Sequence, residues 1–269
     1  MIQGSDLAVV DIGNTSAKVA MCIHNELKVQ SIGHQQSDWE AEVARFPTQL
    51  HGSAPKHWLI ASVNQKRSST LSSFLQKHHP SASVHWVRHH DVPMDSSVDF
   101  PDKLGIDRLL SGFMAAKQYN TPLVIVSFGT AVTIDWIGAD SVFAGGMILP
   151  GLQLQSESLS LRAEALPELQ WEENPKLEVP GKNTLSAIRS GIVLSLAASI
   201  DGFVLRYAEQ HGLDPQQIRT IITGGDAETI MPHLRVDHEF APNLVCRALI
   251  TLHPLNGKSL DNDVNTGQS

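Results

Sequence analysis

Two short turns in this sequence carry residues whose types and spacing could bind an anion. The first turn lies in the segment Asp11-Ile12-Gly13-Asn14-Thr15-Ser16-Ala17-Lys18, directly after an apolar run. Its glycine lets an oxygen-rich ligand approach the backbone, and Asn14 and Thr15 add neutral hydrogen-bond donors. Asp11 stands where a carboxylate could hold a hydrated Mg²⁺, an ion that prefers one or two carboxylates together with phosphate oxygens. An ordinary hairpin turn that binds nothing remains the alternative interpretation.

The second turn lies in the segment Ser127-Phe128-Gly129-Thr130-Ala131-Val132-Thr133-Ile134-Asp135 and again places glycine and a hydroxyl between two apolar runs. Two such turns, one from each half of the chain, could hold a polyphosphate from both sides. The sequence has no G-x-x-x-x-G-K-[ST] pattern, which excludes the P-loop class. No G-x-G-x-x-G follows a predicted strand, so a Rossmann dinucleotide site is not expected.

A carboxylate and a guanidinium meet in Gly105-Ile106-Asp107-Arg108, where an irregular segment passes into a predicted helix. The carboxylate of Asp107 can accept a proton from an alcohol, and the fork of Arg108 can bind a carboxylate or a phosphate. The structural alternative is an aspartate that stabilises the positive end of a helix beside a surface arginine.

Two further glycine pairs follow apolar runs, in Gly145–Gly151 and Thr223–Ala227. The first pair could allow a substrate or a helix to pack closely, and the second could face the base and ribose of a nucleotide. Either pair could equally be a backbone turn without a ligand.

The elements that must position these residues follow one order twice: strand, turn, strand, strand. This repetition predicts an α/β protein with two lobes of related topology, residues 1–115 and 116–255, around a central cleft. A capping box of Ser37 and Glu40 is expected to begin a helix that ends near Leu50. The other predicted strands are 7–11, 18–23, 27–32, 58–63, 84–87, 123–128, 131–137, 142–149 and 220–223, and the other helices are 68–78, 106–119, 184–207 and one from 226. Residues 256–269 are expected to form a disordered tail.

Composition narrows the class of protein further. Of 269 residues, 42% are hydrophobic and 18% charged, which is the composition of a globular chain. The net charge of −8 without a cationic stripe argues against nucleic-acid binding. We expect no membrane span, because no uninterrupted apolar run approaches about 20 residues. With two distant cysteines and no secretory signal, the sequence predicts a cytoplasmic protein without disulfides.

Taken in order, five patterns resemble the type III pantothenate kinase family of the acetate-kinase/sugar-kinase/Hsp70 superfamily. They are D-x-G-N-T-x-x-K, G-x-D-R, G-T-A-x-T-x-D, G-G-x-I-x-P-G and T-G-G-D-A, spread between Val10 and Ala227. The resemblance implies two ribonuclease-H-like lobes with mixed sheets flanked by helices, and usually a homodimer. The activity it implies is ATP-dependent phosphorylation of pantothenate to 4′-phosphopantothenate, the first step of coenzyme A biosynthesis.

The resemblance also implies roles for individual residues. The segment from Asp11 to Lys18 and the side chain of Thr130 would contact ATP, with Mg²⁺ at Asp11. Asp107 would be the base that accepts the hydroxyl proton of pantothenate. Pantothenate itself would lie against Gly105, Ile106, Asp107, Arg108 and Thr184, the last near the dimer interface.

Two positions depart from the pattern of the family. Ser127 replaces an aspartate that binds a monovalent cation, so K⁺ or NH₄⁺ is expected to bind less well. Val98 replaces a tyrosine in the wall of the acceptor site, with Phe100 nearby. These departures leave two alternatives: a kinase for another small hydroxy acid, and an inactive relative that regulates through partner contact, as proposed for the Bvg accessory factors.

Overall fold

The structure is a computed structural model, and it describes residues 6–172 and 175–256. The chain packs as two compact units. Unit 1 comprises residues 1–93, 100–114 and 243–269, and unit 2 comprises residues 94–99 and 115–242. This division assigns the C-terminal helix to unit 1, whereas the sequence suggested a second lobe that continues to residue 255. From residue 257 onward, the predicted tail lies outside the described residues.

Unit 1 is built on a five-stranded mixed sheet with the strand order β3-β2-β1-β4-β5. β1 pairs antiparallel with β2 and parallel with β4, so the β1–β2 turn follows the central strand. The strands are β1 Leu7–Ile12, β2 Ser16–Ile23, β3 Glu26–Gly33, β4 His57–Ser62 and β5 Ser83–Trp86. The helices are α1 Trp39–His51, α2 Gln65–His78, α3 Ile106–Gln118, which continues past unit 1, and α7 Leu244–Asn256, with 3₁₀ turns at His89–Asp91 and Pro101–Lys103.

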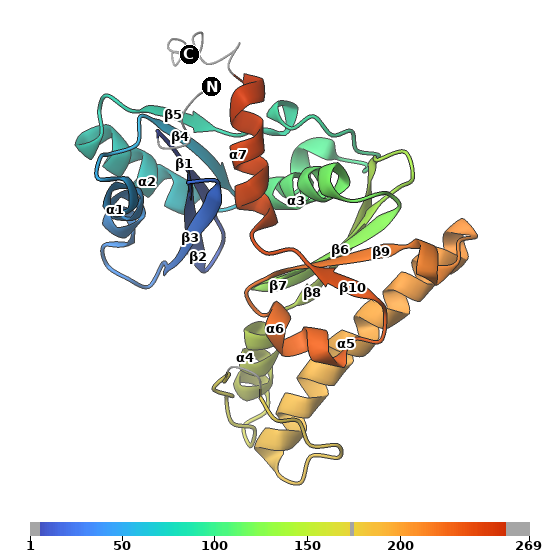
Figure 1. Cartoon of the computed structure of the whole chain (residues 1–269). Helices are drawn as coiled ribbons and strands as arrows, with labels where there is room; N and C mark the ends of the chain where they lie inside the picture. The colour runs from blue at the N-terminus through green and yellow to red at the C-terminus, as the bar shows by residue number, and fades with distance from the viewer. Residues whose placement is uncertain (1–5, 173–174, 257–269) are drawn as a thin grey trace. The chain divides into compact units, whose positions relative to one another are not determined.

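Alternation along β1 divides its side chains between the two faces of the sheet. Ala8, Val10 and Ile12 belong to a buried cluster that includes residues of α1 and α2. The intervening residues, Asp11 among them, therefore point to the opposite face. Helix α7 packs on β1 and β4 from that side, and Figure 1 shows α1 and α2 on one side of the sheet and α7 on the other.

Unit 2 is built on a second five-stranded sheet with the order β10-β9-β6-β7-β8. Pairing is antiparallel between β6, β7 and β8 and parallel between β6, β9 and β10. The strands are β6 Leu123–Phe128, β7 Ala131–Ile137, β8 Phe143–Pro150, β9 Arg219–Gly224 and β10 His238–Phe240. The helices are α4 Leu152–Arg162, α5 Thr184–His211 and α6 Ala227–Ile230, with 3₁₀ turns at Pro215–Gln217 and Met231–His233.

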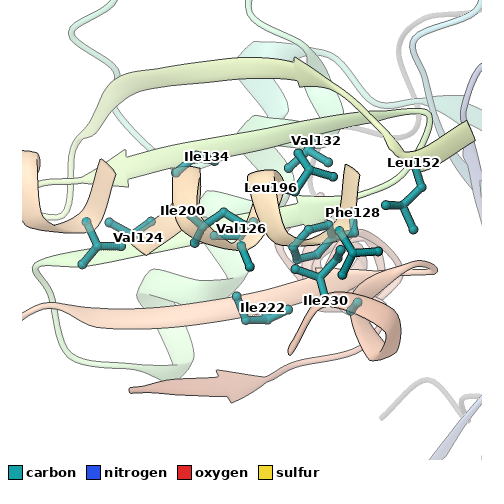
Figure 2. Packing of buried hydrophobic residues seen from close by; sticks show 14 of the residues in the cluster. Val124, Val126, Phe128, Val132, Ile134, Leu152, Leu196, Ile200, Ile222 and Ile230 are labelled. Carbon is teal, nitrogen blue, oxygen red and sulfur yellow. The ribbon is translucent and has the colours of Figure 1, made fainter. Parts of the chain in front are cut away.

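The core of unit 2 lies between its sheet and α5. Figure 2 shows Val124, Val126 and Phe128 of β6 packed with Leu196 and Ile200 of α5. Because successive side chains of a strand alternate, Ser127 points to the face of the sheet opposite this core.

The two sheets have the same topology. In each, a central strand pairs antiparallel with the next strand along the chain, which pairs with the third, while two later strands add in parallel on the other side. The prediction of an α/β protein with two ribonuclease-H-like lobes of related topology is confirmed.

Local expectations were met unevenly. The predicted strands 123–128 and 131–137 are β6 and β7 without a change of boundary. The capping box at the start of α1 was wrong: Asp38 is the N-cap, and no side chain caps the helix. Helix α7 was missed because only Arg247 and Thr251 are polar within Leu244–Leu252, so its polar face is too narrow to mark an amphipathic helix.

By length and composition alone, α5 could cross a bilayer, although Arg189 and Asp201 interrupt its apolar sequence. An 18-residue window of this helix has a mean hydropathy of 1.6, and 44% of that window is buried inside the protein. Ile192, Leu196 and Ile200 are part of the core of unit 2. Core helices pass the same test, so this is weak evidence for a membrane span.

Candidate functional site

The first turn closes the hairpin between β1 and β2. The Gly13 N–H donates to the Ser16 carbonyl at 2.9 Å, while Asn14 and Thr15 are exposed at the tip. Ile12 and Ala17 on either side are fully buried in the core of unit 1. The segment predicted to bind phosphate therefore divides into two core anchors and an exposed, polar tip.

Asp11 and Lys18 lie opposite each other in the register of β1 and β2. Opposed residues of an antiparallel pair share one face, so both side chains lie on the side covered by α7. Burial, and then the negative charge of Asp107, raise the pKa of Asp11 to about 7, while Lys18 acts in the opposite direction. The structure thus brings the two predicted carboxylates close enough to repel each other.

Asp107 occupies the first turn of α3. Its Oδ1 accepts a hydrogen bond from the Arg108 N–H at 2.9 Å, which fixes the carboxylate at the start of the helix. Burial raises the pKa of Asp107, although the Arg108 N–H and guanidinium oppose that change. A carboxylate with a raised pKa is a stronger base, so Asp107 is better suited to accept an alcohol proton than a solvated aspartate.

Gly105 makes room for this carboxylate. A Cβ at residue 105 would lie 2.6 Å from Asp107 Oδ1, and hence would displace an atom already held by the Arg108 N–H. The carbonyl of Leu104 is fixed from the other side by His89 Nε2 at 2.6 Å, and Ile106 is buried. The Gly105–Arg108 segment is therefore an anchored support for one carboxylate.

The second turn, between β6 and β7, is enclosed by two glycines from distant parts of the chain. A Cβ at Gly151 would lie 2.2 Å from the Gly129 carbonyl, and the Gly151 N–H donates to the Thr130 carbonyl at 3.0 Å. Gly224 has a φ of +102°, and a Cβ there would lie 2.0 Å from the Phe128 carbonyl. At both glycine-bearing exits, therefore, the missing side chain lets one backbone segment pack closely against another.

A row of hydroxyls crosses the sheet beside this turn. Ser127 lies opposite Thr133 of β7 and opposite Thr223 of β9. Thr133 donates to Oδ2 of Asp135 at 3.1 Å, and Asp135 is only 1% exposed. Ser127, where the family pattern has an aspartate, thus lies on a neutral, hydroxyl-rich surface. The buried carboxylate of Asp135 follows two residues after Thr133 on β7.

Of the remaining residues predicted for the acceptor site, Val98 and Thr184 lie in unit 2 and Phe100 lies in unit 1. Val98 belongs to a segment that runs along β8, where the Ser97 N–H donates to the Phe143 carbonyl at 3.0 Å, and its Cγ1 lies 4.0 Å from the Cβ position of Gly145. Thr184 is the exposed first residue of α5, whose N-terminus is capped by Asn183. Phe100 is 66% exposed.

Sequence reasoning missed two side chains, one beside Asp11 and one at the first turn. Cys246 of α7 is buried, and its pKa is raised to about 12 by burial and by the charge of Asp11. Its thiol therefore stays protonated at neutral pH. The other, His34, contacts the backbone of the first turn. No local pattern marks either residue, because only the fold brings them to β1.

Asp11, the carboxylate predicted to hold Mg²⁺, is close enough to Asp107 for the charge of Asp107 to raise its pKa. Within residues 6–172 and 175–256, no group of three or more His, Cys, Asp or Glu side chains is arranged to hold a metal. Mg²⁺ commonly takes one or two carboxylates and completes its shell with water and substrate phosphates. Such a cation would also relieve the repulsion that raises the pKa of Asp11.

Comparison with known proteins gives a consistent family. The model of a family described as type III pantothenate kinase matches residues 7–206. A type III pantothenate kinase of Rhodopirellula baltica is 35% identical over 199 residues, which cover 72% of this chain and 70% of that protein. One from Persephonella marina is 28% identical over 256 residues, which cover 92% and 98%.

Solved structures share the fold at low sequence identity. A candidate Baf family transcriptional activator from Campylobacter jejuni superposes with a TM-score of 0.55 at 18% identity, covering 93% of this chain and 99% of that one. The ethanolamine utilization protein EutJ from Carboxydothermus hydrogenoformans gives a TM-score of 0.53 at 13% identity, covering 91% and 88%. At these identities the likeness concerns the fold alone.

Proposed function

Because this chain belongs to the type III pantothenate kinase family, we propose that it transfers the γ-phosphoryl group of ATP to the hydroxyl of pantothenate. The product is 4′-phosphopantothenate, and the reaction is the first step of coenzyme A biosynthesis. The observation that carries the proposal is Asp107, a carboxylate fixed at the start of α3 with a pKa raised by burial.

Asp107 acts as the base in the proposed reaction. The pantothenate oxygen forms a bond to the γ-phosphorus, the bond from that phosphorus to the bridging oxygen breaks, and ADP leaves. The hydroxyl proton passes to the Asp107 carboxylate late in the transfer, once the attacking oxygen has begun to bond to phosphorus. Phosphoryl transfer depends mainly on positioning and charge stabilisation, so a carboxylate of moderate basicity suffices.

The acceptor site is proposed to include the surroundings of Asp107. Arg108 supplies a guanidinium that suits the carboxylate of pantothenate, and Gly105 and Ile106 complete the segment. The pattern of the family adds Val98 and Thr184, and a homodimer in which Thr184 lies near the interface. Exposure of Thr184 at the N-terminus of α5 is compatible with that role.

The nucleotide site is proposed to include the segment from Asp11 to Lys18, with Asn14 and Thr15 at its exposed tip, and Thr130 of the second turn. Asp11 is the proposed residue for Mg²⁺, which would neutralise charge on the phosphate oxygens when bound. A cation at Asp11 would favour the ionised carboxylate against the burial and the charge of Asp107 that raise its pKa, and the charge of Lys18 suits a phosphate at this hairpin.

A monovalent cation is proposed to have only a weak effect. Ser127 offers a neutral hydroxyl where the family pattern has a carboxylate, and its neighbours in the sheet, Thr133 and Thr223, are neutral as well. Stimulation by K⁺ or NH₄⁺ is accordingly expected to be small.

The test is an assay of ADP release by the purified protein with ATP and Mg²⁺, with and without pantothenate and with and without K⁺ or NH₄⁺. Pantothenate-dependent release, with phosphopantothenate identified by mass, supports the proposal. Turnover with another hydroxy acid instead would assign a different acceptor, for which Val98 is the motivating difference. Nucleotide binding without turnover on any such acceptor would overturn the kinase proposal and favour a regulatory protein.

A further inference from the structure

One residue outside the β1–β2 hairpin holds two of its carbonyl groups. The backbone N–H of His34, which directly follows β3, donates to the Thr15 carbonyl at 2.9 Å. Its imidazole Nε2 lies 3.1 Å from the Gly13 carbonyl. A carbonyl oxygen can only accept, so Nε2 carries the hydrogen of this bond. His34 therefore fixes the carbonyls on both sides of Asn14.

The surroundings of the imidazole keep it rigid and neutral. His34 is 6% exposed, and its ring packs edge-on against Trp39, with centroids 4.7 Å apart and an interplanar angle of 76°. Burial lowers the pKa of His34; the charge of Arg67 adds to that effect, whereas the bond to Gly13 and the charge of Glu40 oppose it. Among the described residues Nδ1 has no hydrogen-bond partner, so a second proton there would be buried without compensation.

The bond to His34 replaces a bond expected within the hairpin. In a closed two-residue hairpin, the residues that flank the loop exchange two hydrogen bonds. Here the Gly13 N–H donates to the Ser16 carbonyl, but in the part of the chain that the structure describes the Ser16 N–H does not donate back to Gly13. The Gly13 carbonyl is turned to His34 instead.

This rotation decides where the next N–H points. A trans peptide is planar, so the carbonyl of Gly13 and the N–H of Asn14 lie on opposite sides of their shared peptide. With the carbonyl directed at the imidazole, the Asn14 N–H is directed away from it, at the exposed tip of the turn. Backbone N–H groups that point outward from a turn are suitable anion ligands.

We propose that His34 is a positioning residue for the nucleotide: it holds the Gly13–Asn14 peptide so that the Asn14 N–H faces the phosphates and the Ser16 N–H stays available. This inference rests on the proposed function, because it takes the hairpin as the phosphate site. Without the imidazole, the Gly13 carbonyl can accept from Ser16 and close the hairpin. The backbone bond from His34 to Thr15 is available to every residue except proline, so a side-chain change leaves it in place and acts on the Gly13 bond and on the packing against Trp39.

Three variants separate the hydrogen bond from the bulk of the ring. His34→Leu removes the donor, and His34→Asn keeps polarity but is too short to reach Gly13. His34→Gln places an amide N–H near the position of Nε2. The control is His79→Leu. The ring of His79 also packs beside a tryptophan, with its centroid 6.2 Å from that of Trp58, and among the described residues it has no contact with the first turn.

The expected result is a selective loss of nucleotide affinity. His34→Leu and His34→Asn raise the KM for ATP and the Kd for ADP about tenfold, which is the size of one lost hydrogen bond. The kcat and the KM for pantothenate change little, His34→Gln recovers most of the affinity, and His79→Leu matches the wild type. A purely structural role would reduce the folded fraction, and hence kcat, without a change of KM.

Calorimetric titration with ADP makes the two proposals distinguishable. If the wild type binds ADP but does not phosphorylate pantothenate, the proposed function fails while the Kd values still test His34. An ADP affinity of His34→Leu and His34→Asn within twofold of the wild type would overturn the inference, as would failure of His34→Gln to recover affinity or absence of ADP binding by the wild type. Should His34→Leu not fold, as judged by thermal unfolding, His34→Asn and His34→Gln provide the same comparison.

Discussion

Asp11 and Ser127 occupy the same place in two sheets of the same topology. Each is the next-to-last residue of a central strand, and each is followed by a tight turn into an antiparallel partner. Asp11 lies opposite Lys18, whereas Ser127 lies opposite Thr133. One topology therefore presents a charged, titrating surface in unit 1 and a neutral, hydroxyl-rich surface in unit 2.

The supports of the two turns differ as well. A side chain, the imidazole of His34, fixes the carbonyl of the first turn. Backbone packing against Gly151 and Gly224 encloses the second turn. A shared hairpin thus sets position only, while the chemistry of each turn depends on neighbours that the topology does not specify. The first turn follows a carboxylate with a raised pKa, and the second follows a neutral hydroxyl.

The largest expected effect comes from removal of the proposed base, Asp107, whose charge raises the pKa of Asp11 in unit 1, the charged side of this comparison. We expect Asp107→Asn to lower kcat by about 10³-fold or more, because the amide cannot accept the hydroxyl proton, while ADP affinity persists. Steady-state ADP release and ADP titration provide the measurements. Asp102→Asn is the matched control, since Asp102 is an exposed carboxylate just before the same helix. Equal turnover by Asp107→Asn and wild type would refute the role of this residue.

A single methyl group at Gly224 should disturb the close backbone packing around the second turn. We expect Gly224→Ala to lower the free energy of unfolding by about 2–4 kcal/mol, because the alanine meets the Phe128 carbonyl and must adopt a positive φ. Gly225→Ala, with nothing within 4 Å of the added Cβ, should cost less than about 1 kcal/mol. Urea denaturation of both variants decides, and equal losses would contradict the packing argument.

The charged surface of unit 1 should be visible in the pH dependence of stability. The pKa of Asp11 is raised from 3.8 to about 7, so between these values the folded protein keeps a proton that the unfolded chain releases. Stability from this group is therefore lost as the pH rises through that window. From about pH 5 to about pH 8, the wild type should lose about 2 kcal/mol relative to Asp11→Asn.

Urea denaturation of both proteins at the two pH values measures this difference. Parallel stability curves for wild type and Asp11→Asn would show that Asp11 titrates normally. Asp95→Asn serves as control, because Asp95 is an exposed aspartate of unit 2 and its removal leaves Asp11 and Asp107 in place.

The smallest expected effect comes from a substitution that gives the sheet of unit 2 a carboxylate where the sheet of unit 1 has Asp11. Ser127→Asp introduces a carboxylate beside Thr133 and Thr223, and we expect stimulation of ADP release by K⁺ to increase about two- to fivefold, equivalent to about 1 kcal/mol. The ratio of rates with and without K⁺ is the measurement. Ser127→Asn is the control, since it adds similar bulk without charge. Unchanged stimulation in Ser127→Asp would contradict our account of this position.

Much of the fold was predictable because its signals are local. The apolar runs that form β6 and β7 are separated by two turn residues, Gly129 and Thr130, which set the end of one strand and the start of the next. The start of α1 was not predictable from its pattern, because Ser37 and Glu40 satisfy the capping rule in sequence while the backbone caps at Asp38 without a side chain. Helix α7 was hidden by its mostly apolar sequence, in which only Arg247 and Thr251 are polar between Leu244 and Leu252.

In the candidate site, too, the features with local sequence signals were predictable and those that depend on distant residues were not. Gly105, Asp107 and Arg108 are neighbours in sequence, so one segment predicts both their proximity and their chemistry. The raised pKa of Asp11 was not predictable, since it depends on burial and on Asp107, which is distant along the chain. His34 was missed for the same reason, although its N–H and Nε2 fix two carbonyls of the predicted turn.

The sequence by itself determined the family, the order of the strands from β1 to β9 and the identity of the groups that can donate, accept or carry charge, because these depend on residue types and short spacings. Only the tertiary structure decided which carboxylates repel, which carbonyl an imidazole holds and which glycines leave room for a neighbouring chain. Burial and through-space distance set these properties, and both arise when segments that are far apart in the sequence pack together.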